Sequence, residues 1–527
     1  MKIAFAFPTN RNVEINEVKK GLTPDNALYG FNYLDKKDHA VECEVNTRLE
    51  RAFDVVLHPI NQLFMAQIDI DFKIARALLM TRKLNSADVI VSNIDGISLA
   101  ICFLKRLGLI KPPVIYSIGL FYIQGKMAEA VNSRKNNLFL NFYKWMLQAS
   151  DQLLYHAEIE KEKLRKLGLL DPAKTTFITI GSDDKFFNNP PKKARADVPS
   201  IVSVGKDRAR DYKTLIKAAK ELPDLKFLII CRKSNIQELD IPNNVKLLFN
   251  VPYRRVRDFY NSATIVVIPI KEMYRSSGQM TLTDCMQVGV PVIISRVVGI
   301  SHYPLVNNRN CVLVSPGNTN HLKKAIKSLT NDANLRHKLT TNIKKISKQF
   351  TTKHYSDQLR KVIDWSVDEN QLASITKDDL TYLMKIRNEN NKYFLTTGEI
   401  TFTQQKEWYR SYLKKNSEGS EYMYILKINN KKYGTGAIYE IDYKKSQAKI
   451  GRFIIEKSQR GRGYGDILLK KITYIAFEKL NLEKIGLEVL ASNKQAIKRY
   501  LKSGFKPYKK QTEKGVQIIL MSKAKNS

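Results

Sequence analysis

Short apolar runs alternate with stretches of helical periodicity along the first two thirds of this chain, and the alternation begins twice. Continuous apolar runs are typical of parallel strands, because helices cover both faces of the sheet that such strands form. A helix between two of these runs returns the chain through a right-handed crossover. The sequence therefore predicts an α/β protein that opens with two doubly wound domains.

The predicted elements fall into two groups on either side of Pro190–Arg195, where paired prolines and charges favour a linker. The first group has the strands KIAFAF, DVVLH, DVIVSN, PVIYSIG and Gln152–Tyr155, with helices at Asp71–Lys83, Ile97–Leu107 and Asn136–Ala149. The second has the strands SIVSVG, KFLIIC, VKLLFN, TIVVIPI and PVIISR, with helices at Tyr212–Leu222, Asn320–Leu329, Asn334–Phe350 and His354–Trp365. We expect Rossmann-like domains at residues 1–189 and 196–368.

The pattern changes near Ala373, and a third domain is expected at residues 372–527. Helical patterns come first, and then two strands meet at Asn429-Asn430, a hairpin turn signal. The other predicted elements are the strand KIGRFIIE, the helix Asp466–Leu480, the strand IGLEVLAS, the helix Lys494–Ser503 and the strand VQIILMS. Hairpins combined with a strand–helix–strand unit predict an α/β domain with a mixed sheet.

The charge balance favours anionic partners. The 527 residues include 88 Lys and Arg against 51 Asp and Glu, a net charge of +37. Nucleic acid, an anionic membrane face and phosphorylated substrates all fit such an excess, and a generally lysine-rich composition is the alternative. Because the basic residues are spread along the chain without an RNA-binding motif, we expect no nucleic-acid partner.

Cysteine spacing and the absence of long apolar runs indicate a cytoplasmic protein. The 5 cysteines lie far apart, without a CxxC pair, so neither a zinc site nor a disulfide framework is expected. The opening residues MKIAFAFPTNRN are too short an apolar run for a signal peptide. No stretch reaches the ~18–20 apolar residues of a membrane span. A peripheral position at the inner membrane stays open as an alternative.

The run Arg460–Gly465, with the sequence RGRGYG, joins a predicted strand to a predicted helix. Three glycines let backbone N–H groups turn inward, and the start of the helix adds positive potential. Two arginines add full charges. The loop therefore predicts a cradle for a diphosphate.

This loop and the later run LEVLASNKQAIKRYLKSGF resemble the two signature motifs of the GNAT superfamily of acetyltransferases, over residues of about 372–525. The resemblance implies acetyl-CoA as co-substrate and Tyr500 as the group that protonates the leaving thiolate. It implies that Glu488 removes a proton from the acceptor amine, with Glu456 as a rival base and a strand-face salt bridge as the alternative for Glu488. It also implies cofactor contacts at Phe453, Ile455, Arg460, Gly461, Arg462, Gly463, Tyr464, Gly465 and Asn493.

The opening of the third domain, LMKIRNENNKYFLTTGEITFTQQKEWYRSYL, is similar to N-acetyltransferases that act on nucleotide-linked amino sugars. The resemblance implies that Arg387, Asn388 and Trp408 bind the acceptor. A core aromatic is the alternative for Trp408, and a helix charge is the alternative for Arg387.

Three segments of the first two domains, ITIGSDDKFF, SVGKDRARDYKTLIKAA and SSGQMTLTDCMQVGVPVII, resemble the group 1 family of retaining GT-B glycosyltransferases over residues of about 1–365. The resemblance implies that a nucleotide-sugar donor contacts Lys206, Arg210, Ser277, Gly278, Gln279 and Asp284. Cations at Lys206 and Arg210 would balance the donor diphosphate without a metal. Ser276 takes the place of the family's first acidic residue, so donor identity and even activity stay open.

The stretch Ser133–Ala149 mixes cations with aromatic residues, as a helix at an anionic lipid surface does. An ordinary amphipathic core helix is the preferred alternative. Membrane contact would suit a lipid-linked sugar acceptor.

These observations lead to a hypothesis of two activities on one chain. We expect a bifunctional enzyme of surface-glycan biosynthesis: hexosyl transfer from a nucleotide sugar with retention, and acetyl-CoA-dependent N-acetylation of an amino sugar. One alternative is a nucleotide-sugar hydrolase fused to the acetyltransferase. Another is a non-catalytic GT-B module that presents a glycan to it.

Overall fold

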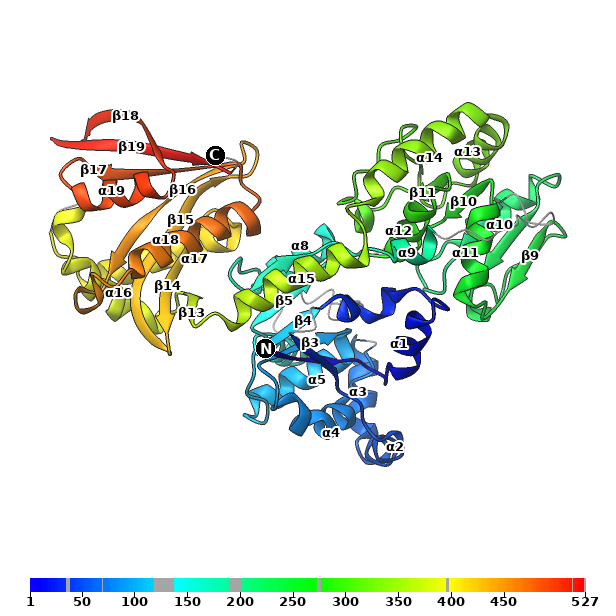
Figure 1. Ribbon diagram of the computed structural model, residues 1–527, viewed down its shortest axis with the longest axis horizontal. Helices are drawn as coiled ribbons and strands as arrows, with labels where there is room; N and C mark the ends of the chain where they lie inside the picture. The colour runs from blue at the N-terminus through cyan, green and yellow to red at the C-terminus, as the bar shows by residue number, and fades with distance from the viewer. Residues whose placement is uncertain are drawn as a thin grey trace. The chain divides into compact units, whose positions relative to one another are not determined.

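The computed structural model describes residues 1–34, 38–68, 70–117, 137–188, 201–272, 276–394, 398–513 and 515–525. The chain forms two compact units (Figure 1). Unit 1 comprises Met1–Leu169 and Phe177–Val367, and unit 2 comprises Leu170–Thr176 and Asp368–Ser527. The predicted linker Pro190–Arg195 lies outside the described residues.

The first sheet belongs to unit 1 apart from Thr175 and Thr176 of β6, and it has six strands in the order β2-β1-β3-β4-β5-β6. Their bounds are β1 (Lys2–Ala6), β2 (His39–Glu42), β3 (Val89–Asn93), β4 (Val114–Ser117), β5 (Gln152–Tyr155) and β6 (Thr175–Phe177). β1 pairs in parallel with both β2 and β3, and β3–β4 and β4–β5 are parallel as well. The strand order reverses beside β1.

The second sheet of unit 1 has the order β12-β11-β10-β7-β8-β9 and is parallel throughout. Its strands are β7 (Ile201–Val204), β8 (Phe227–Ile230), β9 (Val245–Leu248), β10 (Ile265–Ile268), β11 (Val292–Ser295) and β12 (Val312–Val314). The order reverses between β7 and β10. Both sheets thus have the doubly wound arrangement that the sequence predicts.

Helices cover both sheets. Those of the N-terminal half are α1 (Asn12–Lys19), α2 (Thr47–Val56), α3 (His58–Ile68), α4 (Ile74–Leu84), α5 (Asp95–Arg106), α7 (Leu138–Leu147), α8 (Glu158–Lys166) and α9 (Asp184–Phe187). Those of the C-terminal half are α10 (Tyr212–Lys220), α11 (Tyr253–Ser262), α12 (Gln279–Val288), α13 (Thr319–Asn331) and α14 (Ala333–Ser347). The last helix, α15 (Thr352–Val367), returns to the first sheet, where Leu359 and Ile363 join a core cluster with Phe5.

One predicted strand is wrong. The segment DVVLH, read as a buried strand, forms the end of helix α2 and the turn after it. Two of its three apolar residues are exposed, since Val55 and Val56 each keep 76% of their surface. A short apolar run does not distinguish a buried strand from an apolar helix face, and here the helix face points outward. The edge strand β2, which sequence reasoning missed, takes the place in the sheet.

Unit 2 has a mixed sheet in the order β13-β14-β15-β16-β17-β19-β18. The strands are β13 (Asn370–Ser374), β14 (Tyr422–Ile428), β15 (Lys431–Asp442), β16 (Gln447–Ile455), β17 (Lys484–Leu490), β18 (Lys506–Glu513) and β19 (Val516–Ala524). The helices are α16 (Leu380–Asn388), α17 (Phe402–Glu418), α18 (Tyr464–Tyr474), a π-helical turn η8 (Ile475–Lys479) and α19 (Lys494–Lys502). The predicted hairpin is confirmed, with φ angles of 49° at Asn429 and 61° at Asn430.

The predicted fold class is confirmed: two parallel-sheet domains precede a domain with a mixed sheet. Among the helices that the structure describes, none is long and apolar enough to cross a membrane. The described residues also contain no cluster of three or more metal-ligating side chains.

Candidate functional site

Unit 1 holds a pocket of about 760 Å³ where the carboxyl ends of both sheets meet. Ligands of open parallel sheets bind at those ends, at the point where the strand order reverses. In the first sheet, Pro8 follows β1 and Ile94 follows β3, and both line the pocket. In the second sheet, Lys206 follows β7 and Ser277 follows β10, and both line the same pocket. The two reversal points therefore share one pocket.

The six residues predicted to bind the nucleotide sugar all line this pocket. They are Lys206, Arg210, Ser277, Gly278, Gln279 and Asp284. Ser276, which departs from the family motif, lines it as well.

Arg210 lines the pocket as a buried cation with one N–H to spare. Its Nε lies 2.9 Å from Asp207 Oδ2, and its Nη2 donates to Thr281 Oγ1 at 2.8 Å. Its Nη1 is buried and has no partner among the described residues. Gly205 makes room for the guanidinium, since a Cβ there would lie 2.0 Å from Nε. A buried N–H without a partner is costly, and a phosphate oxygen would satisfy it. The neighbouring Asp211 caps α10 instead of pairing with Arg210.

The start of helix α12 also lines the pocket. Gly278 caps this helix with a φ of +78°, and a Cβ there would meet Ile270 at 2.6 Å. Ser277 Oγ donates to Asp207 Oδ1 at 2.7 Å. The same carboxylate thus holds both Ser277 and Arg210. This arrangement brings a helix N-terminus and a cation to one side of the pocket.

Ser276 meets a carboxylate that sequence reasoning missed. Its hydroxyl donates to Glu160 Oε1 at 2.7 Å, and Glu160 Oε2 accepts from the His156 amide at 2.7 Å. Glu160 is 1% exposed and lies 116 residues earlier in the chain. No local motif could have indicated this pair.

Asp284 accepts hydrogen bonds from residues of the N-terminal half of unit 1. Its Oδ1 accepts from Asn26 Nδ2 at 3.0 Å and from the Ser182 hydroxyl. Burial raises the pKa of Asp284 to about 7, and the nearby Asp183 acts in the same direction. The expected ribose contact is untested, and the carboxyl group already joins the two halves through Asn26.

Unit 2 holds a second pocket, of about 420 Å³, where strands β16 and β17 part. The two strands pair in parallel only from Gln447 to Lys449, opposite Lys484 to Gly486. Beyond that point β16 carries one extra residue relative to β15, and Arg452 has a φ of +53°. A bulge of this kind bends a strand away from its neighbour. The gap leaves main-chain groups of both strands for a ligand.

The glycine loop closes one end of this pocket. Gly461 and Gly463 have φ angles of +80° and +83°, and Gly463 caps helix α18. The Arg460 guanidinium donates to Ile455 O at 3.2 Å and to the Asn390 side chain. Of the predicted cofactor residues, Phe453, Ile455, Arg460, Gly461, Gly463, Tyr464, Gly465 and Asn493 line the pocket. Arg462 does not line it.

Tyr500 and Glu488, the two predicted catalytic residues, line this same pocket. Burial raises the pKa of the Tyr500 hydroxyl to about 12, so the group keeps its proton at neutral pH. Glu488 Oε1 lies 2.9 Å from Lys449 Nζ, which also lies 2.9 Å from Glu440. These two carboxylates raise the pKa of Lys449. Glu456, the rival base, is not among the lining residues.

The three predicted acceptor residues lie away from the lining. Asn388 bridges Ile400, donating to its carbonyl at 3.0 Å and accepting from its amide at 2.9 Å. Trp408 stacks on Tyr412 with ring centroids 5.5 Å apart, and the Arg387 guanidinium lies over the ring of Phe394. Their role in acceptor binding stays a prediction. The lining instead includes Asn390, Tyr393 and Phe394, which directly follow helix α16 and which sequence reasoning missed.

Residues 184–346 match the family model of the group 1 glycosyl transferases, and residues 383–505 match that of the acetyltransferase (GNAT) family. The spermidine N(1)-acetyltransferase of Vibrio cholerae serotype O1 is 26% identical over 137 residues, which make up 25% of this chain and 77% of that protein.

Solved structures give weaker likenesses. The spermidine N-acetyltransferase from Vibrio cholerae in complex with CoA and spermine is 22% identical, with a TM-score of 0.28 over 30% of this chain and 96% of that one. Apo FdhC, a nucleotide-linked sugar GNAT, is 20% identical, with a TM-score of 0.27 over 30% of this chain and 87% of that one. Anabaena HepE in complex with UDP is 14% identical, with a TM-score of 0.49 over 69% and 100%.

Proposed function

Since the chain carries a group 1 glycosyltransferase domain and a GNAT acetyltransferase domain, we propose that it is a bifunctional enzyme of surface-glycan assembly. Unit 1 transfers a hexosyl group from a nucleotide sugar to a glycan or lipid-linked acceptor with retention. Unit 2 transfers an acetyl group from acetyl-CoA to the amine of an amino sugar. Both reactions take place in the cytoplasm or at its membrane face.

The donor diphosphate fits the wall of the unit 1 pocket. Lys206, the spare N–H of Arg210 and the start of helix α12 all present positive charge or N–H groups on that side. Preorganised cations and helix dipoles stabilise the charge that develops on a leaving nucleoside diphosphate. We therefore propose that these groups, without a metal, assist departure of the diphosphate.

The acyl transfer uses Tyr500 as the acid. A neutral amine attacks the thioester carbonyl, and the leaving sulfur must gain a proton as its bond to carbon breaks. The Tyr500 hydroxyl is protonated and lines the gap between β16 and β17. Glu488 accepts a proton from the amine through water, and its carboxylate forms an ion pair with Lys449.

The charge of the residues that line the unit 2 pocket supports one class of acceptor over another. Its lining has three arginines, Arg452, Arg460 and Arg499, and one carboxylate, Glu488. Ion pairs join Arg452 to Glu421, Arg499 to Asp466 and Glu488 to Lys449, so the lining offers no unpaired carboxylate. A polycationic acceptor such as spermidine would need unpaired carboxylates to replace its lost hydration. A phosphate-linked amino sugar would be attracted instead. The charge of the lining therefore supports an amino sugar as the acceptor, rather than spermidine, the polyamine after which the Vibrio relative is named.

A direct assay tests both activities. The purified chain is incubated with acetyl-CoA and a panel of UDP-, GDP-, dTDP- and CMP-sugars that includes free-amine sugars, with spermidine and spermine as parallel acceptors. We expect CoA release with an amino sugar nucleotide and an acetylated product by mass. CoA release with the polyamines alone would contradict the proposed acceptor.

A second candidate for unit 1 is a nucleotide-sugar hydrolase or a non-catalytic binding module. The observation that favours it is Ser276, whose hydroxyl is bound to Glu160 where the family has an acidic residue. Donor turnover without any acceptor indicates the hydrolase. Nucleotide binding by calorimetry without turnover indicates the binding module.

A further inference from the structure

The two halves of unit 1 differ in how much apolar surface they leave exposed. Among the described residues, fifteen large hydrophobic side chains are exposed in the N-terminal half and three in the C-terminal half. Seven of the fifteen lie on helices α2 and α3: Leu49, Phe53, Val55, Val56, Ile60, Leu63 and Met65. Single exposed hydrophobic residues are normal, but seven of them on two consecutive helices indicate a contact surface.

Helix α2 turns its polar side inward. Glu50, on the protein side, is bound to Arg76, with Oε2 and Nη1 2.8 Å apart. Arg76 is 1% exposed, and its Nε donates to Phe7 O at 2.8 Å. Leu49, Phe53 and Val56 recur at helical spacing on another side and are 51%, 44% and 76% exposed. The amphipathic pattern of α2 is thus inverted relative to a core helix.

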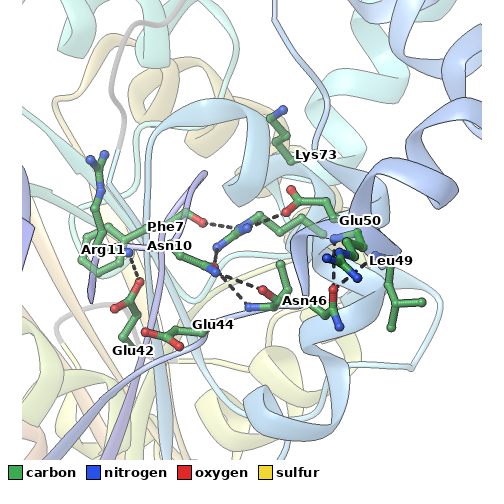
Figure 2. Close-up of polar contacts among 12 residues, drawn as sticks. Phe7, Asn10, Arg11, Glu42, Glu44, Asn46, Leu49, Glu50 and Lys73 are labelled. Carbon is green, nitrogen blue, oxygen red and sulfur yellow. Dashed lines mark hydrogen bonds and ion pairs between the residues drawn. The ribbon is translucent and has the colours of Figure 1, made fainter. Parts of the chain in front are cut away.

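The orientation of α2 is fixed at its start. Asn46 caps the helix and accepts from the amides of Arg48 at 3.0 Å and Leu49 at 3.5 Å. Figure 2 shows that Asn46 and Glu50 lie on the side of the polar contacts around Asn10, whereas Leu49 points away from them. The apolar side of α2 is therefore exposed although both the cap at Asn46 and the ion pair of Glu50 hold the helix in place.

The charges on the outward side are cationic. Arg48 and Arg51 are exposed and form no ion pair with an acid among the described residues. Helix α3 carries no acidic or basic residue apart from His58. Apolar side chains flanked by arginines are the composition that binds the interface of an anionic bilayer.

Helix α7, which packs against the buried Phe64 of α3, has exposed apolar side chains of its own. The ring of Phe139 on α7 lies 5.3 Å from that of Phe64 on α3, so the two helices are neighbours. α7 leaves Leu138 86% exposed and Trp145 37% exposed. The sequence indicated lipid contact for Ser133–Ala149 as the less favoured reading, and its residues 133–136 lie outside the described part of the chain.

The apolar surface adjoins the acceptor side of the unit 1 pocket. Asn61, on α3, donates to Asp71 Oδ1 at 2.9 Å and accepts from the Phe72 amide at 2.8 Å. Asp71 and Lys73 line the pocket, and so does Pro8, next to the carbonyl that Arg76 holds. Docking through α2 and α3 would therefore bring the pocket wall of the first sheet to the membrane surface.

We propose that the consecutive helices α2 and α3 dock unit 1 on an anionic phospholipid bilayer. Leu49, Phe53, Val56 and Leu63 enter the boundary between headgroups and acyl chains, while Arg48 and Arg51 meet lipid phosphates. Docking depends on neither enzymatic activity. The further step, that the glycosyl acceptor is lipid-linked, rests on the proposed function of unit 1.

Vesicle flotation tests the docking. The full chain is mixed with phosphatidylcholine vesicles, with and without phosphatidylglycerol. The test variant is Phe53→Glu/Val56→Glu/Leu63→Glu, at positions that are 44%, 76% and 50% exposed. The control is Val298→Glu/Val306→Glu/Leu413→Glu, at positions that are 50%, 47% and 48% exposed. Both variants change the net charge equally, so the general attraction of a chain with +37 cancels.

The test variant is expected to bind anionic vesicles about tenfold or more weakly than the wild type, since three apolar anchors are lost, while the control binds as the wild type does. Equal loss in the two variants, or no vesicle binding by the wild type, would overturn the proposal. So would light scattering that shows a wild-type dimer and a monomeric test variant with unchanged vesicle binding, which would assign the patch to a second copy. Circular dichroism and acetyl-CoA turnover on a soluble acceptor report that the variant is folded.

Discussion

The two pockets of this chain are built from different parts of the polypeptide. In unit 1 the pocket wall is a network of side chains, in which Asp207 holds both Arg210 and Ser277. In unit 2 it is the parted edges of β16 and β17 and a loop of glycines with positive φ. Ligand binding in the first pocket should therefore be sensitive to loss of a side chain, and in the second to a change in main-chain geometry. Tyr500 is the exception in the second pocket, because its side chain is proposed to act as the acid in acetyl transfer.

Tyr500→Phe tests the exception and should have the largest effect. Loss of the proton donor is expected to lower the kcat of acetyl transfer by on the order of 10²-fold. CoA affinity should stay within a factor of about two, because the ring remains. Stopped assays of CoA release and calorimetric titration with CoA measure the two quantities. An unchanged kcat would remove Tyr500 from the mechanism.

Arg210→Ala tests the side-chain network of unit 1. A lost charge-assisted hydrogen bond to phosphate weakens nucleotide-sugar binding by about 1.5–3 kcal/mol, or about 10- to 100-fold. Titration with nucleoside diphosphates measures it, and acetyl transfer by unit 2 should not change. The matched control is Arg309→Ala, an exposed arginine outside the pocket. An equal loss in both variants would show that only overall charge matters.

Gly463→Ala tests the main-chain geometry of unit 2. A Cβ at a φ of +83° meets no atom within 4 Å, so the effect is backbone strain alone. The left-handed region costs about 1–2 kcal/mol for a residue with a Cβ, which predicts CoA binding weaker by about tenfold. Gly515→Ala has the same strain at a φ of +77° outside the pocket. It should lose stability without losing CoA affinity.

Asp284→Asn, the last of these tests, is followed in the pH dependence of stability. The folded pKa is raised from 3.8 to about 7, so the folded chain keeps a proton that the unfolded chain releases. The free energy of unfolding of the wild type, relative to the variant, should therefore fall as pH rises from about 4 to 7 and level off above that. Urea unfolding at several pH values measures this difference. Asp224→Asn, at an exposed position, serves as the matched control.

The parts of the sites that local sequence could predict are those formed by consecutive residues. The run from Ser276 to Gln279 and the loop from Arg460 to Gly465 each join a strand to a helix. Such turns are fixed by nearby glycines and helix starts, and almost all of their predicted residues line the pockets.

What could not be predicted depends on contacts far apart in the chain. Glu160 reaches Ser276, and Lys449 reaches Glu488 from a neighbouring strand, without any spacing that links them. The prediction of a buried strand at DVVLH was wrong because a short apolar run does not show whether its residues will be buried or exposed. In α2 that side is decided by the buried Arg76, whose binding to Glu50 turns the polar face inward.

The short pairing of β16 with β17 also gives the molecule a built-in reporter. Amides on the facing edges beyond Lys449 and Gly486 have no strand partner, so they should exchange with deuterium quickly in the free protein. A ligand that takes the place of the missing strand would slow that exchange, whatever acceptor is present. Occupancy of the gap could thus be followed residue by residue, separately from catalysis.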